Sequence, residues 1–304
     1  MGSDIDFYVS SQYTLFGVPK CGSGIPILGV PIEDTVSFRP GTRFAPGIIR
    51  YWSQYFEFTP TEDLGIDVLS KACDLGDLTL LQGVVDVNVD RIRSVIKETI
   101  DKWGRIISIG GEHTMSLGTA KAVNESQVHM VFTFTLMRTW IRGRSGRWGQ
   151  SLSHATFVRH LVRHVKPPQL VIFLGFRSYD REEISFARGL ENSILLSTRD
   201  IKLMNDHELR LLIRGAIDSY AGPIHLSIDV DVLDPSIMPG VGNPEGFGLS
   251  YGELLRIVKA ILDYGGSRVK AVDIVEYSPP NDPGLMSLPT IIKLILDVLN
   301  YIHT

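Results

Sequence analysis

Short apolar runs alternate with longer stretches of helical spacing along most of the chain. Uninterrupted apolar runs of about four to eight residues are typical of strands buried on both faces of a parallel sheet. Such runs predict strands at residues 25–30, 105–110, 170–174, 194–197, 224–230 and 269–275, with a further strand end at 73–77. Apolar residues three or four positions apart predict helices from about residue 46 and at 87–103, 155–165, 206–220, 250–264 and 283–301.

The alternation of strands and helices favours an α/β fold with a mostly parallel sheet and helices on both faces. The sequence contains no internal repeat, low-complexity tract or evident linker, so we expect one domain over residues 1–304. Ligands of such folds bind beyond the carboxyl ends of the strands. Catalytic or ligand-binding residues are therefore expected among those that follow the predicted strands.

The most informative of these positions lie in residues 227–235, Ser-Ile-Asp-Val-Asp-Val-Leu-Asp-Pro, which continue an apolar strand. Alternation along a strand would place Asp229 and Asp231 on the same side. Two adjacent buried carboxylates are costly unless a metal or a cationic partner offsets their charge. We interpret them as metal ligands, with helix-capping or turn carboxylates as the alternative. Asp234 is expected to orient the following turn.

A histidine follows another predicted strand. Residues 105–110 lead into Gly110-Gly111, whose backbone freedom permits a sharp turn that would place His113 at the mouth of the sheet. A lone histidine is usually structural, but a position just past a strand end makes it a candidate ligand. Glu276, which follows the strand at 269–275, falls at the same edge.

Composition narrows the class of protein. With 304 residues and 44% hydrophobic content, the chain can bury a large core, and its net charge of -4 gives no general attraction to nucleic acid or anionic membranes. No apolar run approaches the roughly 20 residues of a membrane span, and no signal peptide is evident. Cys21 and Cys73 are the only cysteines, so no disulfide framework is expected and a reducing cytoplasm fits.

Taken together, the motifs resemble the ureohydrolase family of arginases and agmatinases. The resemblance runs from the Arg39-Pro40-Gly41 loop to Pro279, and its motifs are residues 110–113, 153–157, 227–235 and 273–279. It implies a three-layer α/β/α fold and a homo-oligomer, either trimer or hexamer. It also implies a pair of Mn²⁺ ions that activate water to hydrolyse the guanidinium group of a small substrate to urea and an amine.

The resemblance assigns roles to five residues. His113, Asp229 and Asp231 match metal ligands, with Asp229 bridging both ions. His154 matches a histidine proposed to transfer protons, and Glu276 matches the carboxylate that pairs with the guanidinium group. Without the resemblance, His154 would be read as a helix-start residue and Glu276 as a loop carboxylate facing water. The short N-terminal region and residues 153–157 are closer to agmatinases, which implies hydrolysis of agmatine to putrescine and urea.

One motif departs from the family pattern. The family has Phe-Asp-Ala-His-x-Asp on the strand before His154, where this chain has Phe-Thr-Leu-Met-Arg-Thr at residues 134–139. Thr135, Met137 and Thr139 thus replace three ligands, and hydroxyl and thioether groups are poor ligands for manganese. Taken as it stands, the chain keeps half of the metal site. This predicts the alternative function of a catalytically inactive relative with a scaffolding or regulatory role.

The surrounding segment is unusual in its charge. Residues 126–179 contain no Asp or Glu, although the chain has 34 of them, and Arg138, Arg142, Arg144 and Arg147 lie close together. A basic loop of this kind can bind an anion or nucleic acid, or can simply be solvated. The acidic balance of the whole chain argues against nucleic acid as a partner.

A displaced reading frame would explain the altered motif. Residues 135–141 can be encoded as acu uug aug cgc acu ugg au, and the same string read two bases later gives Phe-Asp-Ala-His-Leu-Asp. A chance match of five specified residues at the required place is improbable, which favours a real displaced frame. We hypothesise compensating frame shifts between about Val131 and Gly149, in the gene or in its recorded sequence. On this hypothesis the metal site is complete.

Overall fold

The computed structural model describes residues 3–10, 13–57, 59–62, 67–124, 130–134, 152–154, 156–164, 168–179 and 181–302. In these residues nine strands form one sheet in the order β1-β3-β2-β4-β9-β8-β5-β6-β7. The strands are β1 (Val9–Ser10), β2 (Ile25–Val30), β3 (Ala72–Leu78), β4 (Ile106–Gly110), β5 (Met130–Phe134), β6 (Leu170–Phe176), β7 (Ser193–Ser197), β8 (Ile224–Asp229) and β9 (Val269–Val275). The pairings are parallel apart from that of β1 with β3.

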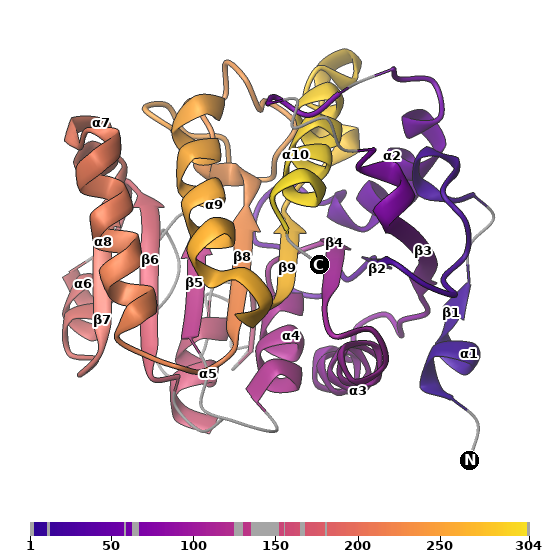
Figure 1. Ribbon diagram of the computed structural model, residues 1–304, viewed down its shortest axis with the longest axis horizontal. Coiled ribbons are helices and arrows are strands. Elements are labelled where there is room, and N and C mark those ends of the chain that lie inside the picture. The colour runs from indigo at the N-terminus through magenta and orange to yellow at the C-terminus, as the bar shows by residue number, and fades with distance from the viewer. Residues whose placement is uncertain are drawn as a thin grey trace.

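Helices cover both faces of this sheet. They are α1 (Asp4–Tyr8), α2 (Ala45–Ser53), α3 (Val85–Trp103), α4 (Met115–Asn124), α5 (Phe157–His164), α6 (Arg181–Arg188), α7 (Thr198–Leu203), α8 (Asp206–Asp218), α9 (Tyr251–Gly265) and α10 (Leu288–Tyr301). Helices α2, α8, α9 and α10 lie in front of the sheet in Figure 1. Helices α3, α4 and α5 pack on the other face.

Alternation of side chains along single strands produces these two layers. On β6, Leu170, Ile172 and Leu174 join the core beneath α8, α9 and α10, whereas Val171 and Phe173 pack with residues of α4 and α5. A strand that is apolar on both sides must bury both. The predicted three-layer α/β/α fold is therefore confirmed.

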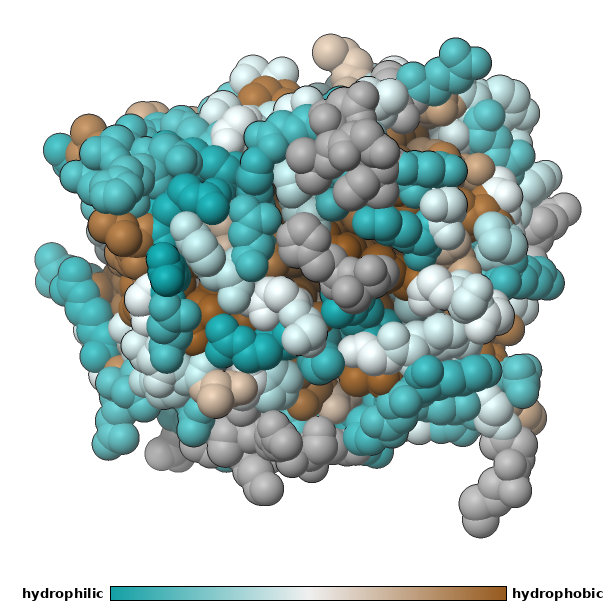
Figure 2. Space-filling model, viewed as in Figure 1, coloured by the Kyte–Doolittle hydropathy of each residue, from teal (hydrophilic) through white to brown (hydrophobic). Residues whose placement is uncertain are grey.

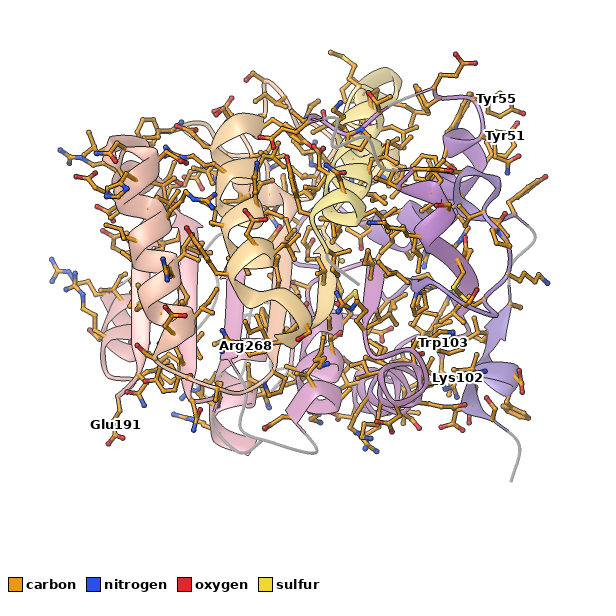
Figure 3. All side chains as sticks on the ribbon, in the orientation of Figure 1. Tyr51, Tyr55, Lys102, Trp103, Glu191 and Arg268 are labelled. Carbon is orange, nitrogen blue, oxygen red and sulfur yellow. A yellow bond between two sulfur atoms is a disulfide. The ribbon has the colours of Figure 1, made fainter. Side chains whose placement is uncertain are left out.

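Local signals in the sequence define several helix ends. Helix α9 begins with a capping box between Ser250 and Glu253, in which each side chain accepts a hydrogen bond from the other residue's backbone N–H. Helix α3 ends at Gly104, whose φ of 83° is accessible to glycine without strain. Lys102 and Trp103, labelled in Figure 3, form the last turn before it, with the ammonium of Lys102 above the indole ring.

The predicted strands are confirmed, with ends displaced by one or two residues. The predicted helix at 283–301 begins later, at Leu288, because Gly284 (φ 62°) and Leu285 (φ 58°) take left-handed backbone conformations that a helix excludes. The pattern did not predict the short elements β1, α1, α6 and α7, the helix α4 or the strand β5, which only the resemblance implied. In α4 every residue but one is buried, so its sequence lacks the polar face that marks an amphipathic helix.

The expectation for the cysteines is wrong. Cys21 and Cys73 form a disulfide across 52 residues of chain. Because β2 and β3 pair in parallel, with Pro26 opposite Cys73, the segment that leads into β2 lies against the start of β3. A count of two cysteines cannot reveal this proximity. The inference of a reducing cytoplasm drew on unpaired cysteines and loses that support.

The surface in Figure 2 is mixed in character. Hydrophilic side chains cover most of the face formed by α2, α8, α9 and α10, with apolar groups showing between them. None of the helices in the described part of the chain is both long enough and apolar enough to cross a membrane.

Candidate functional site

The carboxyl ends of β4, β8 and β9 bring the predicted residues together. These strands are neighbours in the sheet, and the arrows of β6 and β8 point to the same upper edge in Figure 1. The backbone N–H of His113 donates to Oε1 of Glu276 at 2.6 Å, and Nδ1 of His113 lies 3.3 Å from Oδ2 of Asp229. Glu276 takes a left-handed conformation (φ 72°), and its own N–H donates to Gly111 O.

Asp231 reaches this site by a different route from the one predicted. Strand β8 ends at Asp229, and Asp231 lies in the following 3-10 turn, Val230–Val232, rather than two places along a strand. The side chain of Asp229 accepts the Asp231 N–H at 2.9 Å, so Asp229 also caps this turn. Oδ1 of Asp231 is buried and accepts no hydrogen bond from the described residues. An ionised oxygen in that condition requires a cation or a proton.

The electrostatics of the carboxylates agree with this requirement. Burial, followed by repulsion from Asp229, raises the pKa of both Asp231 and Glu276 well above the usual range. The nearby Arg177 donates to backbone carbonyl oxygens, those of Asp231, Val232, Glu245 and Gly246. It therefore ties the loops after β6 and β8 together and only partly offsets the carboxylate charge.

A buried polar network fixes the ring of His113. Its Nε2 lies 2.8 Å from Ser227 Oγ, which contacts Ser116 Oγ at 2.9 Å, and Ser116 donates to Asp273 Oδ2. Asp273 also contacts Nε2 of His225 at 2.7 Å. Burial lowers the pKa of His113 to about 3, so the ring is neutral at neutral pH. With Nε2 engaged by Ser227, Nδ1 faces Asp229, an arrangement that suits a metal-ligating histidine.

His154 lies at the same edge, held by the loop that follows β2. Its Nδ1 is 3.3 Å from Thr35 Oγ1, and its Nε2 is 3.3 Å from Ser37 Oγ. Thr35 in turn donates to the carboxylate of Glu112. Burial lowers the pKa of His154 to about 4 and raises that of Glu112 to about 7.

The described residues supply donor types that suit part of a dinuclear metal site, but they do not form one by themselves. His113, Asp229 and Asp231 offer imidazole nitrogen and carboxylate oxygen, which are hard or borderline donors of the kind that manganese prefers. Across the described ranges, no three His, Cys, Asp or Glu side chains converge into a metal-binding group. The altered positions Thr135, Met137 and Thr139, and the arginines at 138–147, lie outside the described residues.

Asp234 has the structural role predicted for it. Oδ1 accepts hydrogen bonds from the backbone and hydroxyl of Ser236, and Oδ2 accepts one from the N–H of Gly248. These bonds lower the pKa of Asp234 and hold the turn that carries the chain away from the site.

Sequence reasoning missed the residues that support the site. A signal was present on β8, where His225, Ser227 and Asp229 occupy alternate positions of an otherwise apolar strand. Alternation places all three on one face, and the register sets Ser227 beside Asp273 of β9. The contact of Thr35 with His154, 119 residues apart, left no sequence signal.

Comparisons with known proteins give one consistent result. The family model described as the Arginase family matches residues 23–300. The chain is 30% identical over 275 residues to the agmatinase of Bacillus subtilis, covering 90% of each chain. The solved structure of agmatine ureohydrolase of Thermoplasma volcanium has a TM-score of 0.77 at 26% identity, covering 92% of this chain and 90% of that one. Proclavaminate amidino hydrolase from Streptomyces clavuligerus shares the fold, with a TM-score of 0.84 at 22% identity over 97% and 98% of the two chains.

Proposed function

The chain belongs to the arginase family, and on that premise we propose that it hydrolyses agmatine to putrescine and urea with a pair of manganese ions. The observation that carries the proposal is the buried Oδ1 of Asp231, which accepts no hydrogen bond from the described residues, beside two further carboxylates. A buried group of like charges of this kind is stable when a cation binds to it.

His113, Asp229 and Asp231 would hold the metal. Bound there, manganese would lower the pKa of water and supply a nucleophile at neutral pH. The network from Ser227 to Asp273 keeps the His113 ring in place. It thereby reduces the reorganisation that metal binding requires.

Glu276 would bind the substrate. Its carboxylate is nearly fully buried, and a planar guanidinium can form two parallel N–H···O bonds with such a group. The approach of a guanidinium cation would also relieve the repulsion that raises the pKa of Glu276. His154, on the neighbouring segment, would carry the proton that the departing amine requires.

Completion of the site depends on the segment after β5. Strand β5 lies between β6 and β8, and its last residue, Phe134, pairs with Ile228, one residue before Asp229. The altered motif therefore follows a strand that ends at the level of the carboxylates. We propose that the true sequence there is Phe-Asp-Ala-His-Leu-Asp and that frame shifts between about Val131 and Gly149 conceal it.

Two measurements test the segment and the activity separately. Peptide mapping by mass spectrometry across residues 127–157, with the nucleotide sequence, decides which residues the protein carries. If Thr135, Met137 and Thr139 are found and no displaced frame encodes the motif, the frame-shift proposal is refuted. The inactive relative with a scaffolding or regulatory role then becomes the better description.

Urea release from agmatine, with arginine and other guanidino compounds in parallel, tests the reaction. Glu276→Gln should raise KM for agmatine, because the amide cannot accept two charge-assisted hydrogen bonds. Glu191→Gln is the matched control, since Glu191 is an exposed residue that Figure 3 shows at the lower corner, away from the site edge. An unchanged KM in an active Glu276→Gln preparation would exclude Glu276 from this role.

We also propose a homo-oligomer, trimer or hexamer, located in the cytoplasm. Light scattering coupled to gel filtration measures the first, and fractionation of cells measures the second. A monomer at micromolar concentration would contradict the oligomer.

A further inference from the structure

Three elements far apart in the sequence meet at the hydroxyl of Thr35. Thr35 follows β2, Glu112 follows β4, and His154 precedes α5. Strands β2 and β4 are paired, and beyond them the N–H of Glu112 donates to Ile32 O at 2.9 Å. Backbone hydrogen bonds therefore set the distance between Glu112 and the Thr35 loop before either side chain makes a contact.

Glu112 accepts two hydrogen bonds from Thr35. Its Oε2 accepts the Thr35 N–H at 2.9 Å, and its Oε1 accepts the Thr35 hydroxyl at 2.8 Å. Glu112 is fully buried, so these contacts are shielded from water. With Glu112 ionised, the single hydrogen of the Thr35 hydroxyl is thus committed to its carboxylate.

Oγ1 of Thr114 also lies 3.1 Å from Thr35 Oγ1, but the Thr114 hydroxyl hydrogen-bonds to Glu112 as well, so neither threonine has a hydrogen left for the other. The two acceptor sites of the Thr35 oxygen are then left for His154. A hydroxyl has one hydrogen and two acceptor sites. Oγ1 of Thr35 accepts the backbone N–H of His154 at 2.9 Å, and Nδ1 of the same residue lies 3.3 Å away. Because the hydroxyl hydrogen is directed to Glu112, the contact with Nδ1 requires the hydrogen to be on Nδ1. The lone pair of the neutral ring is then on Nε2.

We propose that Thr35, oriented by Glu112, is a positioning residue that fixes His154 as the Nδ1–H tautomer and leaves Nε2 to take or return a proton. The inference rests on the proposed function, in which His154 serves proton transfer. Water attack forms the C–O bond of urea and breaks the C–N bond to the alkylamine, whose nitrogen gains a proton. Only a ring with its lone pair directed to the reacting groups can relay that proton.

Ser37 completes the arrangement at the other nitrogen. Its Oγ lies 3.3 Å from Nε2 of His154 and can donate to the lone pair there. A polar hydrogen of the substrate can replace that donor. Both ring nitrogens of His154 therefore contact hydroxyls of one short loop. This loop sets the orientation of the ring as well as its tautomer.

Matched threonine variants of the full-length, manganese-loaded protein test this proposal. Thr35→Val keeps the shape and removes the hydroxyl, whereas Thr35→Ser keeps the hydroxyl. Thr42→Val is the control, because Thr42 is also a buried threonine, in the 3-10 turn Thr42–Phe44, and its Oγ1 has no hydrogen-bond partner among the described residues. We expect Thr35→Val to lower kcat for urea release about 10- to 100-fold with KM nearly unchanged. The Ser variant and the Thr42 control should stay near the wild type.

A spectroscopic measurement separates this inference from the proposed function. In protein labelled with ¹⁵N-histidine, ring signals assigned by comparison with His154→Gln report the tautomer directly. Nδ1–H is expected in the wild type and in Thr35→Ser, with loss of that tautomer in Thr35→Val. If the wild type releases no urea, the proposed function fails while the ring signals still decide the tautomer. Unchanged ring signals in Thr35→Val, or an unchanged kcat in an active enzyme, would overturn the inference.

Discussion

The sheet contains two groups of acidic side chains whose charge is balanced in different ways. Beside β3, Asp74 and Asp77 surround Arg50, whose Nε and Nη2 bind the two oxygens of Asp74 at 2.8 and 3.0 Å. At the ends of β8 and β9, Asp229, Asp231 and Glu276 lie together, and the nearby Arg177 donates to backbone carbonyl oxygens. The first group binds the guanidinium of Arg50, whereas the second is the group to which the proposed function assigns a metal.

On the proposed function, this difference separates a structural carboxylate from a metal-binding one. Burial raises the pKa of Asp77 even beside Arg50, so burial alone does not identify a site. The two groups differ instead in the hydrogen bonds of their carboxylate oxygens. Arg50 binds both oxygens of Asp74, whereas Oδ1 of Asp231 has no partner among the described residues. Buried polar atoms in native proteins are normally satisfied, and an unpaired oxygen within a group of buried carboxylates fits a bound cation.

The largest effect is expected on removing the cation of the first group. Arg50→Met leaves the buried carboxylate of Asp74 uncompensated and should lower the free energy of unfolding by about 3–5 kcal/mol. Arg214→Met is the control, since Arg214 and Asp218 form an exposed pair at 3.4 Å worth at most about 1 kcal/mol. Urea denaturation measures both variants. Equal losses in the two would show that the Arg50 contacts are no stronger than surface ones.

A disulfide also anchors the group around Arg50, because Cys73 precedes Asp74 and is bonded to Cys21. For a separation of 52 residues the entropy of loop closure gives about 4 kcal/mol as an upper value, and about 2–4 kcal/mol is typical. The double variant Cys21→Ser, Cys73→Ala should lose this amount in urea denaturation. Wild-type protein that is equally stable with and without a reductant would indicate free thiols in solution.

Manganese should stabilise the protein through the second group alone. At a free concentration 100 times Kd, a ligand that binds only the folded state adds about 2.7 kcal/mol. Asp231→Asn should abolish the shift of Tm with Mn²⁺, and Asp77→Asn should retain it, because Asp77 belongs to the group neutralised by Arg50. Differential scanning fluorimetry with and without the metal makes the comparison. Loss of the shift in Asp77→Asn alone would reverse the assignment of the two groups.

The smallest effect concerns pH. Burial raises the pKa of Asp231 above its unfolded value, so metal-free protein loses stability as pH rises through the unfolded pKa toward the folded one. Each pKa unit of difference corresponds to about 1.4 kcal/mol. Asp231→Asn removes this cost, and its stability relative to the wild type should increase from pH 4 to pH 7 in EDTA. A difference that stays constant with pH would mean that Asp231 titrates normally.

The fold and the site were predictable to different degrees. The strands and the three layers follow from apolar runs that must be buried wherever they lie, and the strand-end rule located His113, Asp229 and Glu276. Asp231 lies beside Asp229 as predicted, but in a 3-10 turn rather than on the strand, which ends before it. Period-two reasoning cannot detect a strand that stops one residue early.

The residues that hold the site residues in place could not be predicted, for a different reason. Thr35 and His154 meet only because β2 pairs with β4 while the segment before α5 lies against the loop after β2, and Cys21 meets Cys73 through the pairing of β2 with β3. Such contacts depend on strand order, which no local pattern encodes. Thr35 also lies in a loop, where neither helical nor strand periodicity marks the side that faces the site.

The position of β5 in the sheet has a practical consequence for anyone preparing this protein. The ladders of β5 with β6 and β8 use residues 130–134, and the first altered ligand position, Thr135, follows them. Backbone pairing does not require particular side chains, so the sheet can assemble with either version of the segment that carries Thr135, Met137 and Thr139. A high yield, a sharp melting curve or a native circular-dichroism spectrum would look the same for both, so the quality of a preparation has to be judged by its peptides and its metal content.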